Sequence, residues 1–249
     1  MKKRICQCFG KAAASYSEAA SVQRIVARNC AGLCPQGKYE NVLDVGSGVG
    51  FLHEELQKRI TYRNYVSLDL VRPMLMEQQG SGALLVAADG EELPFVGEKF
   101  DLLVSSSAMQ WYSHPRKSIL QSFDVLKSGG RFAIAIFAQG TLCELADVSA
   151  RTGFGSVQKL RSCEFYKDLF DSMSEIKVDY ANEGHEQFFP SVKHFLKKHK
   201  QTGAVASSEG LSWGKDRYSR FVEEYEALYR EEEGIKASYK VFFAYGEKL

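Results

Sequence analysis

The chain has 249 residues, of which 45% are apolar and 25% are charged, as in ordinary globular proteins with a full core. Its 32 Lys and Arg residues nearly balance its 31 Asp and Glu residues, which argues against a general nucleic-acid binder. No apolar run reaches the ~20 residues that span a bilayer, and no apolar stretch follows the basic start to make a signal peptide. We expect a cytoplasmic protein without a nucleic-acid or membrane partner.

The predicted elements follow a regular order along the chain. Apolar residues recur at helical spacing over 9–30, which predicts one or two amphipathic helices. Short apolar strands then alternate with helices, a pattern typical of a parallel sheet covered on both faces. The strands predicted in this part are 42–45, 65–69, 83–87, 100–105 and 131–137. The helices predicted between them run from the glycines to about residue 59, over 72–79 and over 115–126.

After residue 137 the pattern loosens, with predicted strands at 176–180 and 238–245 and predicted helices at 191–200 and 217–230. We therefore expect one α/β domain over 1–249, with a seven-stranded, mostly parallel, Rossmann-like sheet and an antiparallel last strand. Residues 1–37 should form a helical cap and 38–138 the ligand-binding core. Residues 139–249 should supply the last two strands and a helical lid.

The cysteines do not form a convincing metal site. The first pair is too closely spaced, and no His lies near either close pair, whereas structural zinc sites use matched pairs. Reduced thiols are the better reading, and we expect no metal. The cysteines are Cys6, Cys8, Cys30, Cys34, Cys143 and Cys163.

The segment 42–50, VLDVGSGVG, carries the strongest chemical signal. Gly46, Gly48 and Gly50, with Ser47 among them, let the backbone pass close to a ligand. The helix that follows directs its N–H groups toward that ligand. Glycines alone are weak evidence, because dinucleotide enzymes use a related loop.

Three acids at successive strand ends sharpen this reading. Asp44 lies inside the first strand, where a carboxylate suits a ligand with sulfonium and ammonium charges. Asp69 ends the second strand, where such folds bind ribose hydroxyls, and Asp89 is placed to meet an adenine amino group. Capping or turn roles explain each acid separately, but explain all three poorly. The other positions predicted to bind this ligand are Leu70, Gly90, Ser105 and Ser106.

Over about 38–137 this organisation resembles the class I methyltransferases. Residues 91–95 and 100–105 are similar to two later motifs of that class, and 129–131 to the turn before its fifth strand. The resemblance implies S-adenosylmethionine as cofactor and S-adenosylhomocysteine as product.

A narrower resemblance covers nearly the whole chain. It rests on the segments 9–16 with 22–23, 108–111, 139–145, 192–200, 203–204 with 209–210, and 234–242. These segments are similar to the malonyl-acyl-carrier-protein O-methyltransferases of biotin synthesis. The late segments are the informative ones, since general methyltransferases do not share them. Ser47 departs mildly from the family, which often has Cys there, and 151–162 matches poorly.

This family resemblance implies methyl transfer to the free carboxylate of a malonyl group on acyl carrier protein, giving a primer ester for the pimeloyl chain. A carboxylate with a pKa near ~4 is already a nucleophile at neutral pH, so we expect no catalytic His. Tyr16, Gln110 and Trp111 should line the acceptor pocket. Lys200 is the favoured cation for the acceptor carboxylate. The other candidates are Arg24, Arg151 and Arg161.

The lysines around Lys200 leave two interpretations open. Lys193, Lys197 and Lys198 could dock an acidic carrier protein, or could belong to a solvated face. Three rival functions also remain. They are another small-molecule carboxylate or carbon methyltransferase, a nicotinamide oxidoreductase, which has no use for Asp44, and a cofactor-binding module without catalysis.

Overall fold

The computed structural model describes residues 2–204 and 214–249. Within these ranges one sheet has the order β3-β2-β1-β4-β5-β8-β6, and β7 pairs with β8 outside this path. The strands are β1 (Gly37–Val45), β2 (Ile60–Asp69), β3 (Leu84–Ala87), β4 (Phe100–Ser106), β5 (Leu126–Phe137), β6 (Ile176–Phe189), β7 (Arg230–Glu231) and β8 (Gly234–Lys248). The helices are α1 (Lys2–Ala19), α2 (Ser21–Leu33), α3 (Phe51–Leu56), α4 (Arg72–Met76), α5 (Pro115–Ser122), α6 (Cys143–Thr152), α7 (Cys163–Asp171), α8 (Val192–Gln201) and α9 (Lys215–Tyr229), with short 3₁₀ turns η1 (Met109–Trp111) and η2 (Phe123–Val125).

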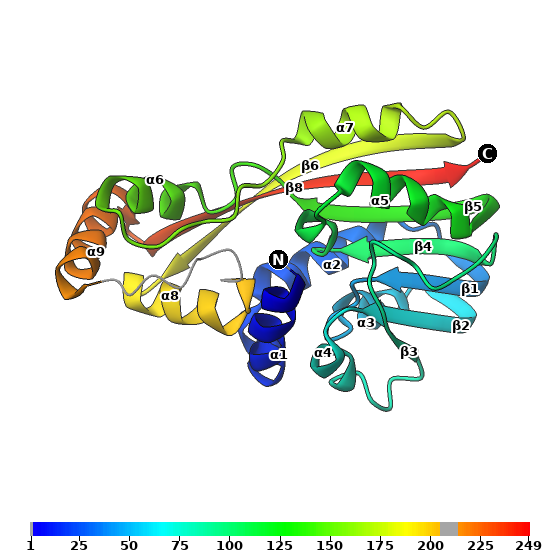
Figure 1. The fold of residues 1–249 in the computed structure, drawn as a ribbon, viewed down its shortest axis with the longest axis horizontal. Helices are drawn as coiled ribbons and strands as arrows, with labels where there is room; N and C mark the ends of the chain where they lie inside the picture. The colour runs from blue at the N-terminus through cyan, green and yellow to red at the C-terminus, as the bar shows by residue number, and fades with distance from the viewer. Residues whose placement is uncertain (1, 205–213) are drawn as a thin grey trace.

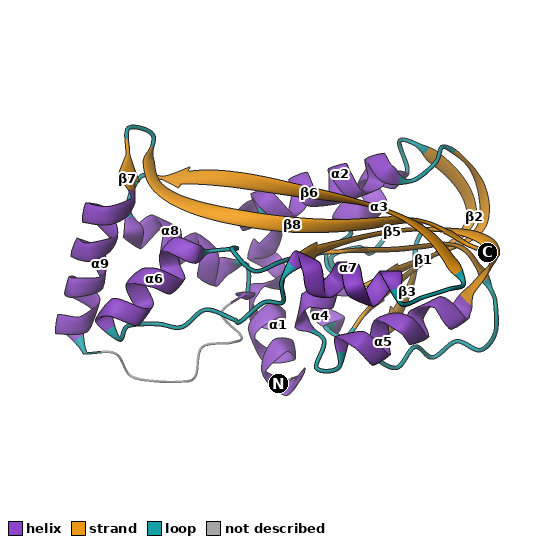
Figure 2. Ribbon diagram, turned by 90° about the horizontal axis from the view of Figure 1, so that it is seen from above, coloured by secondary structure: helices purple, strands orange, loops and turns teal. Residues whose placement is uncertain are grey.

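Strands β1 to β5 are parallel and form the centre of the molecule. Their apolar runs are buried on both faces, as Val42 and Leu43 in β1 illustrate by facing different core clusters. Helices α2 and α3 cover one face and α5 and α7 the other (Figure 2). This arrangement confirms the expected α/β, Rossmann-like sheet.

Strand β8 lies between β5 and β6 and is antiparallel to both. It has 15 residues and β6 has 14, so the antiparallel pair of β6 and β8 extends well beyond the parallel strands (Figure 1). Helices α6, α8 and α9 pack at its far end around Phe195, Phe221 and Ile235. The predicted 176–180 strand is too short because polar residues alternate along β6, which has one solvent-facing side.

Helices α6 and α7 were not predicted from the sequence. Each has ten residues or fewer. Helix α7 is capped by the preceding Ser162, whose hydroxyl accepts a hydrogen bond from the Phe165 N–H. The family-like pair 209–210 lies outside the described residues.

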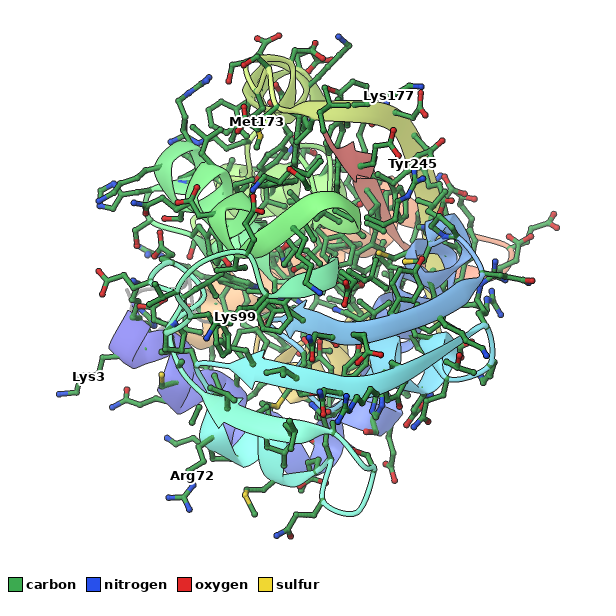
Figure 3. All side chains as sticks on the ribbon, turned by 90° about the vertical axis from the view of Figure 1, so that its right-hand side faces the viewer. Lys3, Arg72, Lys99, Met173, Lys177 and Tyr245 are labelled. Carbon is green, nitrogen blue, oxygen red and sulfur yellow. The ribbon has the colours of Figure 1, made fainter. Side chains whose placement is uncertain are left out.

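Helix α1 lies across the carboxyl edge of the parallel strands, where it contacts α4 and α8. Exposed Lys3 of α1 and Arg72 of α4 project from the same side of the molecule (Figure 3). In the described ranges no helix is long and apolar enough to cross a membrane. No cluster of potential metal ligands occurs there either.

Candidate functional site

A cavity opens at the carboxyl edge of the sheet, under α1. Parallel strands direct their carboxyl ends to this edge, so the loops that follow β1, β2, β3 and β4 converge there. The structure brings most of the predicted site residues to its wall. They are Tyr16, Asp44, Gly46, Ser47, Gly48, Asp69, Leu70, Asp89, Gly90, Ser106 and Trp111.

The glycine loop between β1 and α3 is held tightly against the end of β2. The N–H groups of Gly46 and Ser47 both donate to the Leu68 carbonyl, at 2.7 and 3.0 Å. A Cβ on Gly46 would lie 2.2 Å from the Cβ of Ala108, so only glycine fits. Gly48 has a φ of +55°, and its nearest protein atom would be Met74 Cε at 3.7 Å. A side chain on Gly48 would therefore take up cavity space.

Asp44 is a fully buried carboxylate inside β1 that faces the cavity. Its Oδ2 accepts a hydrogen bond from the Tyr65 hydroxyl at 2.9 Å, whereas its Oδ1 has no partner among the described residues. Burial raises the pKa of Asp44 to about 7, although the Tyr65 hydrogen bond acts against the shift. A buried, unpaired carboxylate oxygen is costly, so this position suits a ligand that brings a donor or a positive charge.

Asp69 joins the end of β2 to the glycine loop. Its Oδ2 accepts from the Gly48 N–H at 2.8 Å and its Oδ1 from the Val71 N–H at 2.7 Å. Burial raises the pKa of this carboxyl, and the two backbone N–H groups oppose the rise. Each carboxylate oxygen has a further lone pair for a ligand hydroxyl. Asp69 consequently has a structural role as well as a place in the cavity wall.

Asp89 has a charged partner that the sequence did not suggest. Lys2 of α1 places its Nζ 2.5 Å from Asp89 Oδ2 and 2.9 Å from Glu91 Oε2. The other Asp89 oxygen, Oδ1, accepts from the Glu91 N–H at 2.9 Å. Lys2 thus fastens the beginning of α1 to the loop after β3, at the rim of the cavity.

A second cavity adjoins the first. Both cavities are lined by Gln23 and Trp111, so they meet at these two side chains. Gln110 lines the second cavity, with walls from β6, β8, α8 and the segment before α7. Trp111 packs edge-on against Phe9 of α1, with ring centroids 5.4 Å apart. The predicted acceptor residues therefore lie at or beside the junction of the two cavities.

Lys200 is not brought to either cavity by the described part of the chain. It is exposed at the end of α8, five residues after Phe195, which is about 140° around a helix from the buried face. Helix geometry directs Lys200 to solvent in the described structure, away from both cavities. Three residues that line the second cavity lie on the same side as Phe195, at spacings of three, four and seven: Lys198 and His199 of α8, and Thr202 directly after it.

The other cation candidates also lie elsewhere in the described structure. Arg24 pairs with Glu54 at 2.7 Å, Arg151 with Asp147 at 2.9 Å, and Arg161 lies over the Phe165 ring. None of the three lines either cavity.

Two of the predicted cofactor residues support the cavity without forming its described wall. Gly50 precedes α3 with a φ of +94°, and a Cβ there would lie 3.0 Å from the Gln78 side chain. Ser105 is buried and donates its hydroxyl to the Val45 carbonyl at 2.7 Å. Both residues lie behind the described wall of the first cavity.

Comparisons with known proteins distinguish the parallel strands β1 to β5 from the outer parts of the chain. A family model described as "Methyltransferase domain" matches residues 43–134, from β1 to β5. This match spans the parallel strands of the sheet and the loops that line the first cavity. A S-adenosylmethionine-dependent methyltransferase structure from Thermotoga maritima has the same fold, with a TM-score of 0.59 and 15% identity over 98% of this chain and 100% of that chain. The α1, α2 and β6–β8 regions lie outside the methyltransferase domain match.

Two relatives do cover those outer regions. The chain is 30% identical to the biotin biosynthesis bifunctional protein BioHC of Teredinibacter turnerae, over 99% of this chain and 47% of that protein. It is 29% identical to a malonyl-[acyl-carrier protein] O-methyltransferase of Hahella chejuensis, over 96% of this chain and 88% of that protein. The chain thus spans about half the length of the bifunctional relative. Both similarities extend beyond the methyltransferase domain into the walls of the second cavity.

Proposed function

We propose that the protein transfers a methyl group from S-adenosylmethionine to the free carboxylate of a malonyl group carried by acyl carrier protein. The observation that carries this proposal is the meeting of two chemically different cavities at Trp111 and Gln23. The first cavity is lined by four carboxylates, Asp44, Asp69, Asp89 and Glu91, and suits a cationic ligand. The second has no carboxylate in its described lining, and so suits an anionic acceptor.

The described residues of the first cavity fit the cofactor. Asp44, with its unpaired Oδ1, would lie toward the positive charges of the amino acid part. Gly48 leaves the space that the cofactor needs, Asp69 would accept from the ribose hydroxyls, and Asp89 would accept from the adenine amino group. When bound, S-adenosylmethionine supplies an electrophilic methyl group. The remaining proposed cofactor residues are Gly46, Ser47, Leu70, Gly90 and Ser106.

The protein's own task in this reaction is alignment and the exclusion of water. A malonyl carboxylate is ionised at neutral pH and attacks without a general base. Tyr16 and Trp111, with Phe9 packed against both rings, would form a dry wall where acceptor and cofactor meet. Holding the reacting atoms in line within such a wall can supply much of the rate enhancement.

The outer elements would serve the acceptor. We assign residues 1–37 and 139–249 to enclosing it and 38–138 to binding the cofactor, within one domain. Exposed Lys193 and Lys197 of α8 would attract the acidic carrier protein, and the protein would act in the cytoplasm. The name of the Hahella chejuensis relative supports the acceptor, and the acidic first cavity supports the cofactor.

The test is a methyl-transfer assay with labelled S-adenosylmethionine and three acceptors: malonyl-acyl carrier protein, malonyl-coenzyme A and free malonate. We expect the carrier-bound acceptor to have the highest kcat/KM. Equal or greater transfer to free malonate would identify a small-molecule carboxylate methyltransferase instead. Binding of NADH in place of S-adenosylhomocysteine would overturn the proposal altogether.

A further inference from the structure

The second cavity has few charged groups in its described wall. Its described wall contains the aromatic rings of Trp111, Phe137, Phe189, Phe195 and Tyr239, and four glutamine side chains. Among its titratable groups are only Lys198, His199 and Tyr239, so Lys198 brings the single formal charge at neutral pH. A ligand with one negative charge would be neutralised by this wall.

His199 contributes an imidazole ring to this wall. Its ring packs on Phe195 with centroids 6.0 Å apart, and it keeps some surface open to the second cavity. Burial lowers the pKa of His199 to about 4, so at neutral pH the ring is uncharged, with one N–H donor and one acceptor nitrogen. Neither ring nitrogen hydrogen-bonds to any residue that the structure describes.

Lys198 is similarly free to receive a ligand. Its Nζ donates only a long hydrogen bond, 3.3 Å, to the backbone carbonyl of Glu18. No carboxylate of the described chain lies within ion-pair distance of it. An ammonium group has three N–H donors, so at least two remain for a ligand. Lys198 and His199 are adjacent in α8 and line the same cavity.

We propose that His199 and Lys198 together hold the acceptor's carboxylate in the second cavity. This inference rests on the proposed function and identifies the residues that select its acceptor. The His199 N–H would donate to one carboxylate oxygen, and Lys198 would supply the positive charge. A lysine does not clamp both oxygens as an arginine does, so one oxygen stays available to attack the methyl group.

Acceptor binding should change the protonation of His199. Burial alone lowers its pKa, and α1, α9 and β6, which pack on α8, add no resolved charge effect in the described structure. Lys198 on its own helix and Tyr239 on β8 are the other titratable groups in the wall. A carboxylate beside the ring favours the imidazolium form, so the pKa of His199 should rise when the acceptor binds.

The direct test follows the His199 ring by NMR in the wild-type protein loaded with S-adenosylhomocysteine. Malonyl-pantetheine serves as the probe, because it has the carboxylate but no carrier protein surface. We expect the pKa of His199 to rise by at least about one unit when the probe is bound, equivalent to a tenfold change in proton affinity. An unchanged pKa with saturating probe would overturn the inference.

Variants give a second, independent measurement. His199→Phe keeps the ring on Phe195 but removes the donor, and should weaken malonyl-pantetheine binding about tenfold or more. His199→Gln restores an N–H donor and should recover most of the affinity, which a merely structural role would not predict. Lys198→Met should weaken binding by a similar factor. Lys200→Met, on the same helix but exposed, is the matched control and should bind the probe as wild type does.

The two proposals can fail separately. If the enzyme methylates malonyl-acyl carrier protein but His199→Phe has normal probe affinity, the acceptor site is elsewhere and the proposed function stands. If no methyl transfer to the carrier occurs but malonyl-pantetheine binds and raises the pKa of His199, the carboxylate site stands. In every variant, affinity for S-adenosylhomocysteine should stay within about twofold, which also confirms a folded protein.

Discussion

Asp44 is the residue whose environment departs most from an ordinary aspartate. It is fully buried, with one unpaired oxygen and a pKa near 7. A cationic ligand stabilises the ionised form of this carboxyl. At a pH below this pKa, Asp44 must lose its proton before its negative charge can attract the ligand. At a pH above this pKa, Asp44 is already ionised.

Cofactor affinity should therefore rise with pH through about 7. At pH 6 roughly one tenth of Asp44 is ionised, so affinity for S-adenosylmethionine should be up to about tenfold lower than at pH 8. Asp44→Asn should bind more weakly and lose most of this dependence. Calorimetry from pH 6 to 8 checks both expectations, and a wild-type affinity that is flat over this range would contradict the role of Asp44.

The same carboxyl should reduce the stability of the protein without cofactor. Because its pKa is raised in the folded state, the folded protein holds the proton between about pH 4 and 7 and the unfolded chain does not. Stability from this group is thus present below that window and is lost as pH rises through it. At pH 8 Asp44→Asn should have the higher Tm, by about 2–4 °C for each kcal/mol gained, and an equal or lower Tm would contradict this.

Alanine substitutions at Gly48 and Gly80 distinguish the loss of ligand space from backbone strain. Gly48→Ala should lower affinity for S-adenosylhomocysteine by at least about tenfold, since the methyl group takes ligand space. Gly80 is an exposed glycine with a φ of +84° and open space around it. Gly80→Ala should cost a similar ~1–2 kcal/mol of backbone strain and leave affinity unchanged. Equal losses of affinity in the two variants would show that strain, and not the cavity, explains the effect.

At the scale of single elements, α8 illustrates what sequence can predict. Its existence follows from the apolar spacing, and its bounds are nearly those predicted. Its basic residues are harder to interpret, because Lys198, which lines the second cavity, and Lys200, which is exposed, look equivalent in sequence. Spacing from Phe195 would have separated them, because residues three and four positions on share a helix face.

Local sequence patterns predict some features of this structure and miss others. The glycine loop and the acids at strand ends are local patterns, so 42–50, Asp69 and Asp89 could be placed at one edge of the sheet. The length of β6 depends on β8, which is distant in sequence, and its alternating polar residues hide the strand. The ion pair from Lys2 to Asp89 joins residues 87 positions apart, and no local pattern encodes it.

The exposed face of α8 yields a prediction about the carrier protein. Lys193→Glu with Lys197→Glu should raise KM for malonyl-acyl carrier protein by roughly three- to tenfold at low salt. The effect should shrink at physiological ionic strength, where the Debye length is ~8 Å. KM for malonyl-pantetheine should not change, since this probe lacks the carrier surface.

A matched control keeps the net charge of that variant. Exposed Lys99 and Lys177 lie on the side of the molecule that faces the viewer in Figure 3, at the amino ends of β4 and β6. The double change Lys99→Glu with Lys177→Glu should leave KM for the carrier near wild type. If both double variants raise KM equally, net charge accounts for the effect and no docking face is needed.

At the scale of the whole molecule, the described residues form three apolar clusters. One cluster lies on each face of the sheet, and the third joins α6, α8 and α9 to the far end of the β6–β8 pair. The third cluster supports the second cavity through Phe195. The cofactor cavity is built mainly from residues of the first two clusters.

Removing a large side chain from the third cluster should therefore weaken acceptor binding more than cofactor binding. Phe221 is fully buried there, with its ring 4.9 Å from that of Phe154. Phe221→Ala should cost about 3–5 kcal/mol of stability and raise KM for the acceptor, while affinity for S-adenosylhomocysteine changes little. Leu228→Ala, at a site 48% exposed on the same helix, should be nearly neutral. Denaturant unfolding with binding calorimetry checks this, and an equal loss of cofactor and acceptor binding would argue against separate support.

The position of β8 inside the sheet also constrains how the protein is synthesised. Strand β6 pairs with β8 alone in the described sheet, and β8 begins 45 residues after β6 ends, from residue 189 to 234. At ribosomal rates of about 5–20 residues per second, these residues take roughly 2–9 s to make. During that time β6 has no partner strand, and an unpaired edge of 14 residues is a site for aggregation. The parallel strands can pair on the ribosome, but β6 must be protected until β8 emerges.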